Sequence, residues 1–148
     1  MRISETTRLT CGILLLVVPL IQYGGTLLLR TVVFREARSA SSQVQQELRH
    51  SGHAHSGVLL VLALLCQFLI DCANMPAGLT LLVRIGVVAG AVLVPLGFLI
   101  SSGARPAEQP EPAMQLIFLG STLLAISLLL LGAGLLGVLP LADLRPAG

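Results

Sequence analysis

The sequence predicts an all-α integral membrane protein, a four-helix bundle whose helices alternate up and down. Of its 148 residues, 55% are apolar and only 11% are charged, whereas about 25% of a typical soluble domain is charged. The mean hydropathy is +0.92. Four apolar stretches are each long enough to cross a bilayer, which takes about 20 helical residues. We therefore expect a single membrane domain over residues 1–148, in contact with lipid.

The four helices are predicted at residues 9–29, 53–72, 76–102 and 114–139. The first lies between Arg8 and Arg30, and we expect it to be retained because no small-x-small cleavage site follows it. The second apolar stretch is long enough to cross a bilayer only if its helix begins at the histidines. Pro76 suits the first turn of the third helix, and Pro140 ends the fourth. Since hydrocarbon offers no partner to an unpaired backbone amide, each stretch should be helical.

The connections between the helices differ in character. Residues 30–52 are predicted to form a polar loop, and residues 103–113, with three prolines, an extended link. The short turn at 72–76 makes the second and third helices antiparallel neighbours. Five arginines lie on the side of the two long loops and three in the tails. By the positive-inside rule the 30–52 loop leans cytoplasmic.

Small residues form a stripe on each of the last two predicted helices. Such stripes let two helix backbones approach closely in lipid. We expect these two faces to meet, either within one chain or across a dimer. The residues are Gly86, Gly90 and Gly97 in the third helix, and Gly120, Ser127 and Gly134 in the fourth.

Two ionisable residues, Asp71 and Arg84, lie inside the apolar stretches, where a charge is costly and normally faces a partner or water. Asp71 stands five residues before Pro76 and Arg84 eight after it. Across the tight turn their depths differ by about three residues, or roughly 4.5 Å. The spacing predicts an ion pair between the second and third helices, acting either as a structural staple or as a substrate or proton site.

Three histidines, His50, His53 and His55, precede the second apolar stretch in the segment HSGHAHSG. If Gly52 and Gly57 keep this segment loose, the three imidazoles suit a transition metal ion such as Zn²⁺ or Cu²⁺. The spacing belongs to no established metal motif. An interfacial structural role and a role in handling protons or a small molecule therefore remain open.

A continuous second helix predicts a different arrangement of the same residues. At about 100° per residue, His53 and Asp71 share one face, with Gln67 close to it, whereas His55 lies on another face. His53 and His55 then cannot chelate one ion together. Each is instead a candidate single ligand, for example to a haem or to a metal completed by another helix.

The segment from Gly52 to Gly57 reads G-H-A-H-S-G and, together with YGGTLLLR near the end of the first helix, resembles a group of small bacterial four-helix membrane proteins. A G-H-A-H-[AS]-G motif opens the second helix of that group. The resemblance covers the first half of the chain. It implies a bacterial plasma-membrane protein, and it implies no particular activity.

Several functional classes lack the residues they need. The sequence contains no G-x-S-x-G, no H-E-x-x-H and no phosphate-binding glycine loop, so we favour a role without catalysis. A net charge of +2 gives no support to nucleic-acid binding. Our first hypothesis is a structural or accessory subunit, self-associating or part of a larger membrane complex. The alternative is a protein that binds a metal or haem, or handles protons or a small solute, through His53 and His55.

Overall fold

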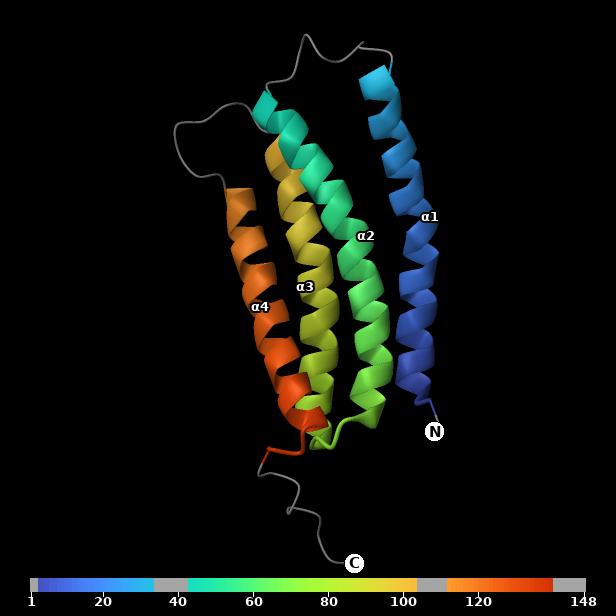
Figure 1. Cartoon of the computed structure of the whole chain (residues 1–148), viewed down its shortest axis with the longest axis vertical. Helices are drawn as coiled ribbons and strands as arrows, with labels where there is room; N and C mark the ends of the chain where they lie inside the picture. The colour runs from blue at the N-terminus through green and yellow to red at the C-terminus, as the bar shows by residue number, and fades with distance from the viewer. Residues whose placement is uncertain (1–2, 34–42, 104–111, 140–148) are drawn as a thin grey trace, which may run out of the picture.

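The computed structural model describes residues 3–33, 43–103 and 112–139. This part of the chain forms four helices and no strand: α1 (Glu5–Val33), α2 (Gln43–Cys72), α3 (Ala77–Gly103) and α4 (Pro112–Leu135). Each helix is long and apolar enough to cross a membrane. Successive helices run in opposite directions (Figure 1). The predicted fold class, an integral membrane bundle of four up-and-down helices, is confirmed.

The first two helices are longer than the sequence predicted. α1 begins at Glu5 because Ser4 caps it, with the Ser4 hydroxyl oxygen accepting a hydrogen bond from the Thr7 amide at 3.1 Å. α2 begins at Gln43, well before residue 53, and its first turn carries a 3.2 Å hydrogen bond from Gln43 Nε2 to Glu47 Oε1. Glutamine and glutamate favour helix even where they are too polar to signal a membrane span. Much of the loop predicted at 30–52 is therefore helical, and the rest of it lies outside the described residues.

The fourth helix is shorter than predicted, ending at Leu135 rather than at 139. Gly137 has a φ of 68°, a left-handed conformation that glycine adopts without strain. The Val138 amide donates to the Ala133 carbonyl at 3.2 Å, and the Gly137 amide donates to the Gly134 carbonyl at 3.3 Å. These two bonds form a Schellman motif, which ends the helix before Pro140 is reached.

The small-residue faces of α3 and α4 meet within one chain. A Cβ added at Gly90 would lie 2.8 Å from the Gly120 carbonyl oxygen. At the other end of the contact, a Cβ on Gly97 would lie 2.9 Å from the Ala113 carbonyl oxygen. Ser127 fills the space in front of Gly86 in the same interface. The two helix backbones therefore approach closely over the stretch of α3 from Gly86 to Gly97.

Gly134, the last residue of the predicted α4 stripe, packs against the turn between α2 and α3 rather than against α3. A Cβ on Gly134 would lie 2.5 Å from Met75 Cγ. The Asn74 amide also donates to the Gly134 carbonyl oxygen at 3.2 Å. The end of α4 thus fixes the α2–α3 turn in place.

The α1 helix packs more loosely than the others. It contributes Leu14 to the buried apolar core, which α2, α3 and α4 otherwise build. Its backbone packs against α2 and, within the described residues, makes no close approach to α3 or α4. Most of its large apolar side chains, such as Leu16 and Leu20, are exposed on the outside of the bundle. Polar contacts near the start of α1 add to this limited packing.

Because α3 and α4 approach so closely, adding one methyl group at their contact should lower the stability of the protein. We expect Gly90→Ala to destabilise the protein by about 1–3 kcal/mol, because the new Cβ meets backbone and neither helix can yield without losing contacts. Gly78→Ala is the control on the same helix, since a Cβ there meets nothing within 4 Å. Thermal unfolding in a mild detergent measures both, and equal unfolding temperatures for the two variants would contradict the packing.

Candidate functional site

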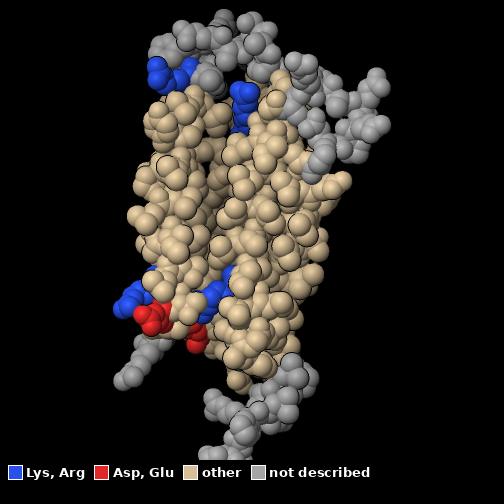
Figure 2. Space-filling model, turned by 180° about the vertical axis from the view of Figure 1, so that it is seen from behind, with Lys and Arg blue, Asp and Glu red and all other residues tan. Residues whose placement is uncertain are grey.

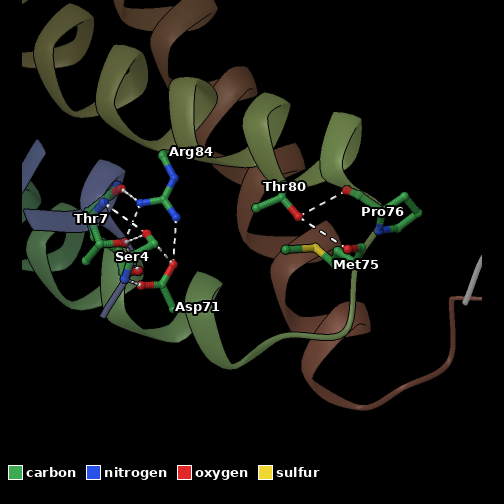
Figure 3. Close-up of polar contacts among 8 residues, drawn as sticks. Ser4, Thr7, Asp71, Met75, Pro76, Thr80 and Arg84 are labelled. Carbon is green, nitrogen blue, oxygen red and sulfur yellow. Dashed lines mark hydrogen bonds and ion pairs between the residues drawn. The ribbon is translucent and has the colours of Figure 1, made fainter. Parts of the chain in front are cut away.

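The predicted ion pair between Asp71 on α2 and Arg84 on α3 is present. Arg84 Nη2 lies 2.8 Å from Asp71 Oδ1, and the two side chains are only 7% and 9% exposed. The short turn before Pro76 makes the two helices antiparallel and brings the residues to nearly the same depth (Figure 3). A charge-assisted hydrogen bond of this length is among the stronger kinds in proteins.

Arg84 makes two further hydrogen bonds with its other terminal nitrogen. Nη1 donates to Thr7 Oγ1 of α1 at 2.7 Å and to Gln67 Oε1 of α2 at 2.8 Å. Thr7 and Gln67 are both completely buried. A single guanidinium group therefore joins three helices.

The start of α1 completes the partners of Asp71. The Ser4 amide donates to Asp71 Oδ2 at 2.9 Å, and the Ser4 hydroxyl donates to Asp71 Oδ1 at 3.0 Å. Both carboxylate oxygens are thus occupied. We call this group the polar cluster; its members are Ser4, Thr7, Gln67, Asp71 and Arg84.

The sequence identified three members of the polar cluster and missed Ser4 and Thr7. Both precede residue 9, where the apolar stretch begins, so hydropathy alone left them outside the first helix. The segment S-E-T-T carries the signal that was available. A serine followed by an acidic residue is typical of a helix start, and the resulting helix places Thr7 on its inner face.

The α2–α3 turn is held by hydrogen bonds of its own. The Thr80 amide and hydroxyl both donate to the Pro76 carbonyl oxygen, at 2.9 and 3.0 Å. The hydroxyl also lies 3.4 Å from the Met75 carbonyl oxygen. Figure 3 shows this turn beside the polar cluster. Thr80 and Arg84 both lie on α3, four residues apart. The turn therefore fixes the register of α3 against α2.

The polar cluster has the properties of a structural staple. Nearly every donor and acceptor in it is paired, and among the described residues its one buried side-chain atom without a partner is Gln67 Nε2. Each Asp71 oxygen and both terminal nitrogens of Arg84 already have partners. A substrate or proton would have to displace these bonds, at the cost of leaving a charge unpaired in a buried site.

The histidines lie on a continuous helix and point in different directions. α2 runs without a break through residues 50–57. His50 is exposed. His55 stacks on Phe98 of α3, with 5.0 Å between ring centroids, and its Nδ1 lies 2.7 Å from the Ser51 carbonyl oxygen. Because a carbonyl only accepts, Nδ1 carries the proton in that contact.

His53 lies against α1. A Cβ added at Gly25 would be 2.7 Å from His53 Nε2, so the imidazole occupies the space that the missing side chain leaves. His53 shares the inner face of α2 with Gln67, as predicted, but 14 residues separate them, which is about 21 Å of helix. It therefore belongs to the opposite end of the bundle from the polar cluster.

These positions do not bring the three predicted metal ligands together. Within the described residues, no group of three or more His, Cys, Asp or Glu side chains is placed to hold a metal ion. The physical reason is the helix itself, which separates the directions of His53 and His55 by about 200°. The loose segment that a three-histidine site requires is not formed at residues 50–57.

Comparison of the chain with protein-family models, with curated proteins and with solved structures gives no match. The resemblance to small bacterial membrane proteins that carry the G-H-A-H-[AS]-G motif thus stays a prediction. Any function proposed for this chain has to come from its own residues.

Because the members of the polar cluster bond to one another, we expect the effects of their substitutions on stability to be coupled. We expect Arg84→Met to destabilise the bundle by about 3–5 kcal/mol, because it leaves the buried Asp71 carboxylate without its counter-ion. The double variant Asp71→Leu/Arg84→Met should recover much of this loss, since no unpaired charge remains. Equilibrium unfolding in mixed micelles measures both variants.

The exposed pair of Glu5 and Arg8 supplies the control for the polar cluster. These side chains are 79% and 76% exposed and 3.6 Å apart. Arg8→Met should change stability little, because exposed ion pairs contribute little. The single variant Asp71→Leu completes the set. If the stability losses of Asp71→Leu and Arg84→Met simply add in the double variant, the two residues do not act as a unit.

Adjacent glycines on α1 give a test of the His53 position. Gly25→Ala should turn the imidazole away from α1, whereas Gly24→Ala should leave it in place, because a Cβ at Gly24 meets nothing within 4 Å. NMR of protein labelled at histidine, with His53 assigned from His53→Gln, reports the ring environment. Equal shifts in the two alanine variants would place His53 away from Gly25.

Proposed function

We propose that this protein is a non-catalytic bundle of the bacterial plasma membrane that acts as a structural or accessory subunit, docking through α1 onto a second copy or a larger membrane complex. The observation that carries this proposal is the pairing inside the polar cluster. Asp71 and Arg84, charged residues buried between the described helices, hold these helices together, and their charges and the carboxylate oxygens already have partners. Buried groups that move protons or solutes must be able to change their hydrogen-bond partners. Asp71 and Arg84 could do so only by breaking the bonds that hold the helices together.

The distribution of packing supports α1 as the docking helix. The small-residue face that most often joins membrane helices is already used between α3 and α4. By contrast, α1 makes its backbone contacts with α2 alone among the described helices. Leu16, on its outer side, is 77% exposed. α1 is thus the helix of this bundle with most surface left for a neighbour.

Arginine is unevenly divided along the sequence. Five arginines stand in or beside the α1–α2 and α3–α4 connections, among them Arg30 and Arg49 at the end where α1 leads into α2, and three stand near the chain termini. The positive-inside rule favours a cytoplasmic position for that end. Labelling an engineered cysteine in the α1–α2 connection with an impermeant reagent in intact cells reads the orientation directly.

A photo-crosslinking residue placed at Leu16 tests the docking role. In intact membranes we expect one discrete protein adduct from this position, because a docked neighbour keeps a fixed place beside α1. Leu129 on α4, which is 74% exposed, is the matched control and should give lipid adducts only. An adduct of twice the chain mass identifies self-association, and a heavier discrete adduct identifies a larger complex. Lipid adducts alone at both positions would contradict the proposal.

A further inference from the structure

A groove runs along the bundle between α1 and α3, with α2 as its floor. It has a volume of about 580 Å³, and its walls are apolar, with Leu20 and Leu27 from α1 and Leu96 and Leu99 from α3. The groove exists because the backbones of α1 and α3, over the described residues, do not approach each other closely. Figure 2 shows a long hollow in this face of the molecule, with basic side chains near its upper end.

The groove has the length of one bilayer leaflet. On α1 its lining extends from Val17 to Leu28, which is about 16 Å of helix. The hydrocarbon core of a bilayer is about 30 Å thick, so one leaflet contributes roughly half of that. Leu20, at the edge of the groove, is 70% exposed, so the groove opens sideways toward lipid. Its dimensions fit an extended acyl chain lying parallel to the helices.

Polar groups line one end of the groove. Arg49, His53 and Ser56 follow one another at spacings of four and three residues, which places them on one face of α2. Among the described residues, neither the Arg49 nor the His53 side chain has a hydrogen-bond or ion-pair partner. The end of an apolar groove thus carries a cation and an imidazole, both available to an anion.

We infer that this groove is a binding site for an anionic phospholipid of the surrounding bilayer. One acyl chain lies between α1 and α3, and Arg49 and His53 hold the head-group phosphate. Guanidinium groups suit phosphate because they donate two parallel hydrogen bonds. No carboxylate lines the groove within the described residues. The site therefore offers nothing to the ammonium group of a zwitterionic lipid, which is the reason for a preference for negative head groups.

Native mass spectrometry of the full chain in mild detergent tests the site with phosphatidylglycerol and phosphatidylcholine of identical acyl chains. We expect one phosphatidylglycerol per chain, bound about tenfold or more tightly than phosphatidylcholine. Arg49→Gln should lower phosphatidylglycerol affinity to the level of phosphatidylcholine. Arg30→Gln is the matched control, since it removes the same charge from an exposed residue that does not line the groove, and it should retain the preference.

A second pair of variants tests the acyl chain separately from the head group. Gly24 lines the groove, and a Cβ there meets nothing within 4 Å, so Gly24→Leu should fold and fill the groove. It should weaken binding of both lipids, whereas Gly12→Leu, on the same helix but outside this groove, should not.

Three results would overturn the inference: equal affinity for the two lipids, equal effects of Arg49→Gln and Arg30→Gln, or equal effects of Gly24→Leu and Gly12→Leu. The measurement uses the isolated chain, so its outcome is separate from whether α1 docks onto a partner in the membrane.

Discussion

The architecture depends on the need to keep one guanidinium ion, that of Arg84, out of contact with hydrocarbon. A buried charge is tolerated only when it is paired and its remaining donors are hydrogen-bonded. No single neighbouring helix supplies enough partners, and the structure draws them from two, with Thr7 from α1 and Gln67 and Asp71 from α2. The ends of three helices are therefore fixed relative to one another by one side chain.

The bundle combines two kinds of helix contact that contribute differently. Between α3 and α4, missing side chains bring backbones together, and the contact is stabilised by dispersion over a long surface. Between α1 and the rest, a few directed polar bonds act at one end, while His53 lies against Gly25 at the other. The first arrangement brings the two helix backbones into contact along the glycine positions. The second holds α1 in place but leaves room between it and α3.

Much of this organisation could be predicted from the sequence because it rests on composition and short-range spacing. The four spans follow from hydropathy, and the pairing of Asp71 with Arg84 follows from their positions five residues before and eight residues after Pro76, across a tight turn. The contribution of Ser4 could not be predicted from the same signals, because a contact across 67 residues depends on how α1 is placed against α2. The three-histidine site failed as a prediction for a local reason: polar residues at 43–52 continue the helix, and a continuous helix separates neighbouring side chains. The groove was not predictable, since it arises where two helices fail to meet.

The long separation between the members of the polar cluster has a consequence for biogenesis. Ser4 and Thr7 leave the ribosome before the other members of the cluster, yet Thr7 bonds to Arg84, 77 residues later in the chain. α1 therefore enters the bilayer before its partners on α2 and α3 exist, and its bond to Arg84 can form only after α3 has been made and turned back against α2. Contacts between such distant positions form slowly. Completion of the polar cluster is thus a late step of assembly, and a chain interrupted before α3 holds the Asp71 carboxylate in the bilayer without its counter-ion.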